Sequence, residues 1–383
     1  MLAPSQIPPS PDAQATTTRW HYYLYSRDAW DAMYKDCNEA QTSIAYEQYI
    51  LDNDEVGRRF MDLFIRKAKE GVQVVLVCDQ FGSRRLYKSA IVDEFRKAGG
   101  QFYFYHPVNF FTKLVPWLCF PRTHTKTLLI DSQIAYGGGV CVAEYMHTWR
   151  DTQMRVIGPV THQIEYRFNE LISQLTSSRG EKILRRLWHI GHRQPSLPAD
   201  DGFQYQMNRP GRASYAMYKD IMRAIGRAEQ YVYITSAFFI PGHRFFKQIR
   251  KARERGVDVR VMLPQKSDVP LADLICMSYF HKLLKDGIRI FYYQPTVLHT
   301  KSAVVDGKWA TVGSTNFDLL SFFYNREANF IVTDTAAISQ LEQHFYNDLQ
   351  ACVEVTREYL RQVPLWKKIV GYAGRIIKMS FGS

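Results

Sequence analysis

The sequence predicts an α/β fold built as two similar halves in tandem. Apolar runs with strand character alternate with helical stretches along the chain. One run, VQVVLVC at 72–78, is apolar throughout, as expected of a strand buried on both faces of a parallel sheet. Several segments also recur about 185 residues apart, which indicates an internal duplication. A length of 383 residues suits two domains.

The first half shows the alternation of strands and helices. Ser26 is expected to cap a helix that carries Trp30, Met33, Tyr34 and Cys37 on one face. The elements expected after it are a strand at 42–51, a helix at 54–70 that ends at Gly71, the buried strand at 72–78, a helix at 88–98 that ends at Gly99, and the strand QFYFY. This order is a βαβ rhythm.

The second half repeats the first at several points. KAKEGVQVVLV at 67–77 corresponds to KARERGVDVRVML at 251–263, and AMYKD occurs at both 32–36 and 216–220. The expected divisions are a disordered leader at 1–18, a first α/β domain at 19–175, a connector at 176–202, a second α/β domain at 203–350 and a basic amphipathic tail at 351–383.

The chain is basic and shows no signal for a membrane span. It has 49 Lys and Arg against 37 Asp and Glu, a net charge of +12. This balance favours a phosphate-bearing partner, either nucleic acid or an anionic membrane. No run of 18 apolar residues occurs, and the N-terminus lacks the regions of a signal peptide. The six cysteines form no C-x-x-C pair, as expected of reduced thiols in a cytosolic protein.

One polar pattern occurs once in each half with the same internal spacing. The residues His124, Lys126, Asp131 and Gly138 recur 175 residues later as His299, Lys301, Asp306 and Gly313. A single H-x-K on a strand is an ordinary exposed pair. Two copies with identical spacing inside a duplicated fold indicate a functional site.

Each copy places one imidazole and one ammonium group on the same side of a strand, because residues two apart face the same way. Two such copies facing one another would supply what phosphodiester chemistry needs without a metal or another cofactor. One imidazole attacks phosphorus, the other protonates the leaving oxygen, and the lysines neutralise the remaining oxygens. The residues expected to approach or hydrogen-bond the phosphate are Gly138, Gly139, Ser314 and Asn316.

The repeated pattern H-x-K-x4-D-x6-G-[SG]-x-N resembles the motif of the phospholipase D superfamily, over residues 19–350. The resemblance implies two phospholipase D-like α/β halves packed about a pseudo-twofold axis, each a mixed central sheet flanked by helices. It also implies a phosphohistidine intermediate. WRDTQMRVIGPV, EQYILDNDEVG and the long segment that begins VVDGKWATVGSTNFD are similar to bacterial cardiolipin synthases. That likeness implies transfer of a phosphatidyl group from one phospholipid to an alcohol acceptor, phosphatidylglycerol.

The resemblance implies a role for each motif residue. His124 is assigned as the nucleophile and His299 as the general acid. The catalytic set is completed by Lys126, Asp131, Lys301 and Asp306. Cys141 stands where the family motif has Asn, so the first half is expected to hold phosphate less firmly, since a thiol is a weak hydrogen-bond partner.

Two further carboxylates are expected to orient the histidines. Asp151 lies 27 residues after His124, and Glu327 lies 28 residues after His299, each early in a strand-like run. A carboxylate behind each histidine would fix its tautomer, so Asp151 is assigned to His124 and Glu327 to His299. The alternative is an ordinary salt bridge at a strand edge.

Two apolar segments bear on the partner. The segment 108–120 is either a lip that enters lipid or a buried loop. From Pro364 a helix would align apolar side chains beside basic ones, the apolar set being Leu365, Trp366, Ile369, Val370, Ala373, Ile376 and Ile377 and the basic set Lys367, Lys368, Arg375 and Lys378. This pattern is typical of a helix at an anionic membrane surface, and a terminal helix docked on the protein is the alternative.

The expected partner is therefore an anionic phospholipid, phosphatidylglycerol or cardiolipin, contacted from the cytoplasmic face of the inner membrane by a peripheral protein. Nucleic acid is not expected, because basic and aromatic residues do not interleave along a track. The alternatives are a phospholipase D that hydrolyses phospholipids, a nuclease of the same superfamily and an inactive membrane scaffold.

Overall fold

The computed structural model describes residues 17–106, 121–177, 201–208 and 215–380, the last five by backbone alone. The expectations for a leader at 1–18, a connector at 176–202 and an apolar lip at 108–120 therefore fall wholly or almost wholly outside the described residues.

The chain divides into two compact units. The first contains 1–137, 141–147 and 153–205, and the second contains 138–140, 148–152 and 206–383. The second unit thus includes two short stretches from within the first predicted domain. The predicted boundaries at 19–175 and 203–350 stay a prediction.

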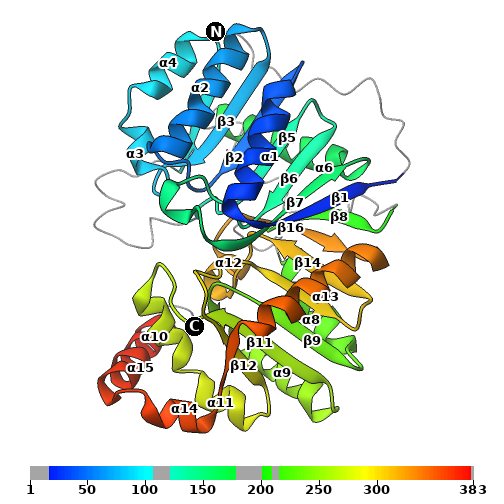
Figure 1. The fold of residues 1–383 in the computed structure, drawn as a ribbon, viewed down its shortest axis with the longest axis vertical. Coiled ribbons are helices and arrows are strands. Elements are labelled where there is room, and N and C mark those ends of the chain that lie inside the picture. The colour runs from blue at the N-terminus through cyan, green and yellow to red at the C-terminus, as the bar shows by residue number, and fades with distance from the viewer. Residues whose placement is uncertain (1–16, 107–120, 178–200, 209–214, 381–383) are drawn as a thin grey trace. The chain divides into compact units, whose positions relative to one another are not determined.

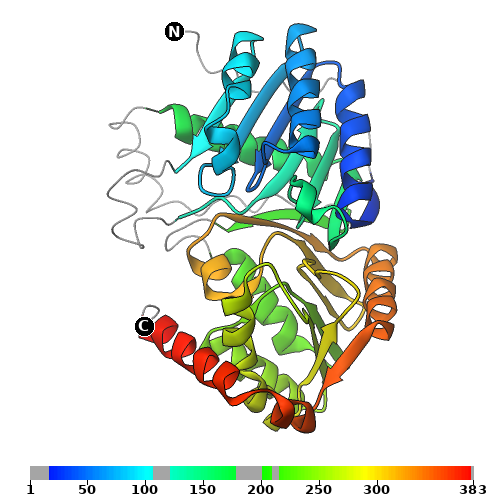
Figure 2. The same cartoon turned by 60° about the vertical axis from the view of Figure 1, so that its left-hand side comes forward.

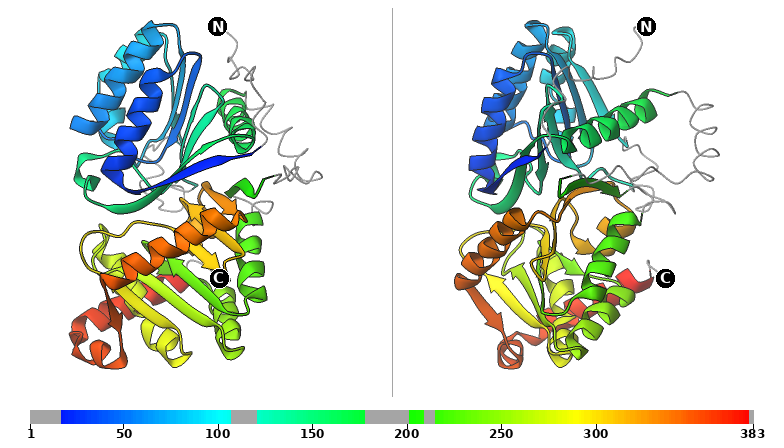
Figure 3. Two further views of the ribbon diagram at one scale, coloured as in Figure 1. Left: turned by 45° about the vertical axis from the view of Figure 1, so that its right-hand side comes forward. Right: turned by 90° about the vertical axis from the view of Figure 1, so that its right-hand side faces the viewer.

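The first half of the chain forms a mixed sheet with helices on both faces. Its elements are β1 (Arg19–Tyr25), α1 (Ser26–Glu39), β2 (Ser43–Gln48), α2 (Glu55–Lys69), β3 (Gln73–Asp79), α3 (Arg84–Tyr87), α4 (Ile91–Lys97), β4 (Gln101–Tyr105), β5 (Lys126–Ile130), β6 (Ile134–Gly138), the 3-10 helix η2 (Glu144–Met146), β7 (Arg150–Ile157) and α6 (Val160–Thr176). β2, β3 and β4 are parallel, whereas β5 is antiparallel to its neighbours β2 and β6 (Figure 1). Helices α1 and α2 cover one face and α6 the other (Figure 3).

The second half repeats this plan. Its elements are β8 (Phe203–Asn208), α8 (Ala216–Arg227), β9 (Tyr231–Thr235), β10 (Phe239–Ile240), α9 (His243–Glu254), β11 (Asp258–Pro264), α10 (Pro270–Met277), α11 (Phe280–Lys285), β12 (Arg289–Tyr293), β13 (Ser302–Val305), β14 (Trp309–Gly313), β15 (Phe317–Asp318), α12 (Leu319–Phe323), β16 (Glu327–Val332), α13 (Thr335–Gln350), β17 (Cys352–Val355), α14 (Arg357–Gln362) and α15 (Leu365–Ser380). Helices α8 and α9 lie on one face of the sheet and α13 on the other (Figure 3).

The two sheets share one strand topology. The first has the order β4-β3-β2-β5-β6-β7-β1, and the second has the order β12-β11-β9-β13-β14-β16-β8 with β17 added antiparallel beside β12. The isolated parallel bridge between Leu51 and Val142 also has a counterpart, the short parallel pair β10–β15. The predicted α/β class and the predicted duplication are therefore confirmed.

Local signals place most helix ends where the sequence predicts them. Asp54 is the N-cap of α2, because its Oδ1 accepts a hydrogen bond from Gly57 N at 3.0 Å. Gly71, which ends the same helix, has a φ of +90°, the left-handed conformation that glycine adopts at low cost. Ser26 is a correction. β1 runs directly into α1, so the N-cap position is Tyr25, Ser26 is already helical, and no side chain caps this helix.

The C-terminal helix α15 docks on the protein, as the second alternative for this segment predicts, and membrane contact stays a prediction. It lies along α10, with Gly371 and Gly374 against Leu274 and Ile275 (Figures 1 and 2). A Cβ at Gly371 would lie 2.3 Å from the carbonyl oxygen of Leu274, so only glycine permits this approach. The predicted apolar face points away from the contact, with exposed side chains at Leu365, Trp366, Ile369 and Val370.

The basic residues of α15 differ in their surroundings. The Arg375 guanidinium lies 4.4 Å above the ring of Tyr279 and donates to the carbonyl of Ser278, so this cation fastens the helix to the protein. The predicted side-chain roles of Ile376, Ile377 and Lys378 lie outside the described residues. Within the described part of the chain, no helix is long and apolar enough to cross a bilayer.

Candidate active site

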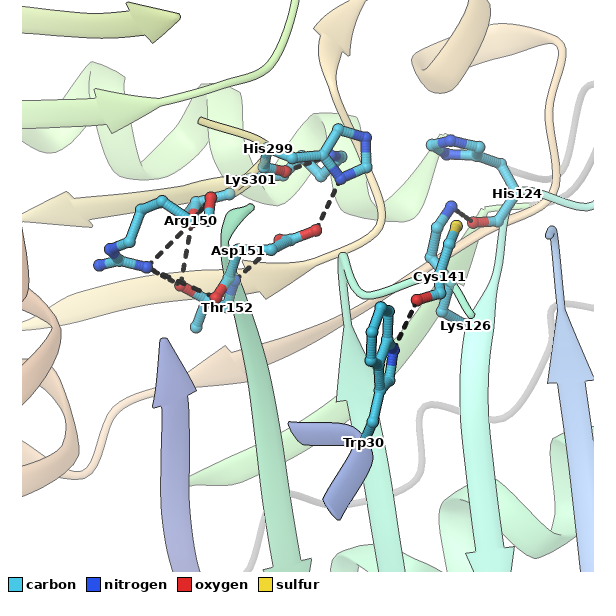
Figure 4. Close-up of polar contacts among 10 residues, drawn as sticks. Trp30, His124, Lys126, Cys141, Arg150, Asp151, Thr152, His299 and Lys301 are labelled. Atoms are coloured by element: carbon cyan, nitrogen blue, oxygen red, sulfur yellow. Dashed lines mark hydrogen bonds and ion pairs between the residues drawn. The ribbon is translucent and has the colours of Figure 1, made fainter. Parts of the chain in front are cut away.

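The first H-x-K motif forms a half-site at the beginning of β5. Lys126 is 1% exposed, and its Nζ donates a hydrogen bond to the carbonyl of His124 at 2.6 Å (Figure 4). Tyr49 contacts both residues. Its ring centroid lies 4.9 Å from that of His124, edge to face, and 5.0 Å from the Lys126 ammonium. An aromatic face beside a desolvated ammonium group stabilises the charge.

A buried polar scaffold holds the residue before His124. The Thr123 hydroxyl donates to Glu47, and its backbone N donates to Asp79 Oδ2 at 3.2 Å. Arg122 Nη1 lies 3.4 Å from the other oxygen of Asp79. Burial raises the pKa of the Asp79 carboxyl despite the guanidinium and three backbone donors. Sequence reasoning missed this scaffold, because Glu47 and Asp79 each occur in a strand that is otherwise read as core.

The second motif forms an equivalent half-site in the second unit. Lys301, also 1% exposed, donates from Nζ to the carbonyl of His299 (Figure 4). The ring of Trp149 lies 5.2 Å from the His299 ring, between centroids. Each motif therefore has the same arrangement: a buried lysine bonded to the carbonyl of its own histidine, and an aromatic ring against the imidazole.

Asp151 orients His299, which corrects the predicted pairing. His299 Nδ1 lies 2.6 Å from Asp151 Oδ2, a hydrogen bond that fixes the orientation of the imidazole ring (Figure 4). The prediction assigned Asp151 to His124 and Glu327 to His299. It was wrong because the chain enters β7 beside the second motif: Arg150 forms a parallel bridge with Leu298, and His299 N donates to Arg150 O at 2.8 Å.

The electrostatic surroundings of His299 favour its neutral form. Burial lowers the pKa of this imidazole, and the charge of Lys301 lowers it further, while Asp151 opposes both effects. With Nδ1 donating to Asp151, the neutral ring presents a lone pair at Nε2.

Arg150 supports the contact between Asp151 and His299 through hydrogen bonds to neighbouring residues of both. Its guanidinium, in a side chain 2% exposed, pairs with both oxygens of Asp348 at 2.9 and 2.6 Å. It also donates to the hydroxyls of Thr152 and Thr300, the second of which lies between His299 and Lys301. Arg150 precedes Asp151 in the sequence, but no pattern there indicates Asp348, which lies 198 residues further along.

Each of the small residues Gly139 and Ser314, which follow the motif aspartates, contacts a carboxylate. A Cβ at Gly139 would lie 2.1 Å from Asp151 Oδ1, so glycine makes room for that side chain. At the equivalent position, Ser314 Oγ donates to Glu327 Oε2 at 2.6 Å. The equivalence is exact in the backbone: Gly139 N donates to Thr152 O, and Ser314 N donates to Ala328 O. Both residues were predicted to contact phosphate, and the structure assigns them this supporting contact.

Asn316 and Cys141 occupy the last motif position. Asn316 is 5% exposed, and its side-chain oxygen has no hydrogen-bond partner within the described residues, although buried amides are normally paired. A hydroxyl would donate to this oxygen, and with the amide in the flipped orientation its nitrogen would donate to a phosphate oxygen. Cys141 is buried, and its carbonyl accepts a hydrogen bond from Trp30 Nε1 at 2.8 Å (Figure 4). The cysteine backbone is thus held firmly despite the change of side chain.

The motif aspartates are structural, which corrects their predicted catalytic role. Asp131 follows β5 at the end opposite His124, about 17 Å along the strand from Lys126. Its carboxylate accepts from the backbone N of Gln41, Thr42 and Ser43 at 2.8–2.9 Å. Asp306 does the same at the start of β9, with the backbone N of Glu229, Gln230 and Tyr231. Each aspartate therefore fastens a strand end.

Replacing Asp131 with Ala is expected to destabilise the protein without slowing the folded enzyme. Three backbone donors lose a charged acceptor, which costs about 1–3 kcal/mol of unfolding free energy. Urea unfolding would measure this loss, and kcat of the folded fraction would stay within about twofold of the native value. A fall in kcat with unchanged stability would restore the catalytic assignment.

Comparisons with known proteins agree with the motif. The family model described as "Cardiolipin synthase, PLD-like domain" matches residues 33–145 and 221–349. A cardiolipin synthase of Clostridium perfringens is 31% identical over 344 residues, which cover 88% of this chain and 71% of the relative. One from Staphylococcus aureus is 31% identical over 362 residues, covering 90% and 70%. The chain belongs to the cardiolipin synthase family of phospholipase D-like proteins.

Solved structures extend the likeness of this cardiolipin synthase family member to the fold. A phosphatidylserine synthase of Haemophilus influenzae Rd KW20 superposes with a TM-score of 0.74 at 13% identity, covering 94% of this chain and 93% of that one. A polyphosphate kinase of Porphyromonas gingivalis gives a TM-score of 0.55 at 13% identity, covering 87% and 50%. At these identities the likeness concerns the fold alone. The resemblance noted in the sequence is confirmed.

Proposed function

We propose that the protein is a phosphatidyltransferase of the cardiolipin synthase type. It moves a phosphatidyl group from one phosphatidylglycerol to a glycerol hydroxyl of another and releases glycerol. The observation that carries the proposal is the repeated half-site, in which a buried lysine donates to the carbonyl of its own histidine in both motifs. Membership of the cardiolipin synthase family supports the choice of lipid substrates.

Both motifs act on one phosphodiester in this proposal. A ring nitrogen of His124 forms a bond to phosphorus as the bond from phosphorus to the glycerol oxygen breaks, and His299 gives its proton to that oxygen. Glycerol leaves. The acceptor hydroxyl then loses its proton to His299, and its oxygen bonds to phosphorus as the bond to His124 breaks. Lys126 and Lys301 stabilise the charge on the other phosphate oxygens.

The protonation of His299 changes with the step. In the unliganded protein its pKa is lowered, chiefly by burial. A bound phosphodiester adds a negative charge nearby, which favours the charged imidazolium that the first step needs. After glycerol leaves, the neutral ring, held by Asp151, is ready to accept the proton of the acceptor.

Vesicles of phosphatidylglycerol in buffer with EDTA provide the test. The expected result is cardiolipin and glycerol in equal amounts by mass spectrometry, at a rate that chelation leaves unchanged, since lysines supply the charge stabilisation. The vesicles are prepared without divalent ions, so that EDTA does not change the lipid surface itself. Phosphatidic acid as the main lipid product would indicate hydrolysis instead. Dependence on an added divalent ion would contradict the mechanism, and no product at all would contradict the function.

Attachment to the membrane surface through α15 is part of the proposal, with the protein on the cytoplasmic face. The helix exposes 71% of Leu365 and 59% each of Trp366 and Ile369, while its glycines face α10. A terminal helix that served only to complete the core would bury these side chains instead. Large exposed apolar side chains beside lysines are typical of a helix at a lipid surface.

The double substitution Leu365→Gln and Ile369→Gln is expected to weaken binding to phosphatidylglycerol vesicles about 10- to 100-fold. Full burial of each side chain contributes about 1.5–3 kcal/mol, and these side chains are already partly covered. The melting temperature should not change, since both side chains are exposed in the protein. Vesicle sedimentation measures the binding, and Tyr166→Gln, an exposed aromatic on α6, is the control. Equal binding by the double variant would place the membrane contact elsewhere.

A further inference from the structure

A cavity of about 750 Å³ lies in the second unit among α10, α14, α15 and the loop after β11. Its volume is in the range of pockets that bind small molecules. No motif residue lines it, so it is not the half-site of His299 itself.

The cavity has an apolar wall and a cationic rim. The wall includes Leu274 and Met277 from α10, Val363, and Trp366 from α15. Lys266 and Lys367 are the lysines among its lining residues. Neither ammonium group pairs with a carboxylate in the part of the chain that the structure describes, and Lys367 Nζ lies 5.6 Å from the ring centroid of Trp366. An amphiphile with a negative head complements this lining.

The one carboxylate in the lining is already engaged. Asp273 Oδ2 accepts a hydrogen bond from Ser267 N at 2.9 Å, and burial raises the pKa of its carboxyl. Asp273 therefore shapes the loop after β11, and the two lysines outnumber this single carboxylate in the lining.

The surface around the cavity favours a ligand that comes from a bilayer. Leu271 on α10 is 55% exposed, and the neighbouring Val269 is also exposed. On α15, Trp366 both lines the cavity and belongs to the exposed apolar face. The apolar surface thus continues from the outside of α15 into the cavity through Trp366, which a soluble ligand would not require.

The same loop leads from the cavity to the second half-site. Gln265, Lys266 and Ser267 line the cavity, and the next residue, Asp268, is close enough to His299 for its charge to act on that imidazole. The loop that carries Lys266 thus also borders the second half-site.

We propose that this cavity binds the acceptor lipid, one anionic glycerophospholipid, with its phosphate at Lys266 and Lys367 and its acyl chains against Leu274, Met277 and Trp366. The inference rests on the proposed function, since it assigns the non-reacting phosphate of phosphatidylglycerol to this cavity and its glycerol hydroxyl to the His299 half-site. It accounts for the choice of a lipid alcohol over water as acceptor.

The binding test uses the full chain with His124→Ala, which stops turnover. Native mass spectrometry with dioctanoyl phosphatidylglycerol is expected to show a second bound lipid, the acceptor, besides the donor at the motifs, and dioctanoyl phosphatidylcholine is expected to occupy the second site at least tenfold more weakly. Lys266→Gln with Lys367→Gln should weaken binding of this second lipid at least tenfold, and Met277→Trp, which fills the cavity, should do the same. The control Lys247→Gln with Lys251→Gln removes two exposed lysines from α9 and should bind as before.

The kinetic test uses the chain with both motif histidines intact. With a soluble dioctanoyl donor, the lysine pair variant should lower transfer to phosphatidylglycerol at least tenfold more than transfer to ethanol. A second bound lipid that survives both cavity variants, or equal loss of transfer to both acceptors, would overturn the inference. A chain that binds phosphatidylglycerol in the cavity yet transfers no phosphatidyl group would retain the binding site and refute the proposed function.

Discussion

His299→Ala is expected to lower phosphatidyl transfer about 10²- to 10⁴-fold and still form the covalent intermediate on His124 when the leaving group is good. Removal of a general acid lowers the rate of a reaction by about this factor. A leaving group such as p-nitrophenol departs without needing a proton. Intact-protein mass spectrometry after rapid denaturation at neutral pH would show the added phosphatidyl mass, and peptide mapping would place it on His124.

The reciprocal substitution tests the same assignment. His124→Ala should form no adduct with any leaving group, because the nitrogen that bonds to phosphorus is gone. His281→Ala, an exposed histidine on α11, is the control and should behave as the native protein. The two half-sites resemble one another closely, so the reverse assignment has a clear signature: an adduct on His299 in the His124→Ala variant.

Asp151→Asn is expected to lower kcat on the order of 10²- to 10⁴-fold with little change in KM or stability. The amide can donate to His299 Nδ1 where the carboxylate accepts from it, and this favours the wrong tautomer. The amide oxygen can still accept the hydrogen bond from Thr152 N, now 2.8 Å from Asp151 Oδ1, so the strand should keep its place. Steady-state kinetics and thermal unfolding measure the two effects, and Asp62→Asn, at an exposed position of α2, is the matched control.

The dependence of kcat on pH distinguishes a role of Asp151 in orienting His299 from a purely structural role. Asp151 raises the pKa of His299 against burial and the charge of Lys301. Without the carboxylate, burial and the charge of Lys301 are opposed only by the smaller effect of Asp268, so the limb of the profile that reports His299 should move to lower pH. A variant with lower kcat and an unmoved profile would show that Asp151 supports the fold and not the imidazole.

Much of the fold follows from periodic and local signals in the sequence. The βαβ rhythm, the N-cap at Asp54 and the helix end at Gly71 depend on neighbours a few residues away, and the structure has them where the pattern indicates. The predicted Ser26 cap fails for a local reason too, because β1 continues into α1 without the turn that a capping residue needs.

The roles of the site carboxylates depend on contacts between distant segments. The repeated spacing identifies Asp131 as part of the motif, but only the register of β5 beside β2 shows that its carboxylate meets the backbone of residues 41–43, far from His124. Likewise, nothing in the spacing of Asp151 shows that the bridge between Arg150 and Leu298 carries it to the other motif's histidine.

The α/β class, the duplication, the two histidines and two lysines, and the apolar face of the C-terminal helix can all be predicted from the sequence. Residue type and spacing indicate these features, because side chains face the same side every two residues in a strand and about every 3.6 residues in a helix. The tertiary structure alone decided that Asp151 serves His299, that Asp348 anchors Arg150 and that Gly371 turns the apolar face of α15 outward. Each of these depends on the close approach of segments about 100 to 200 residues apart, which no local pattern encodes.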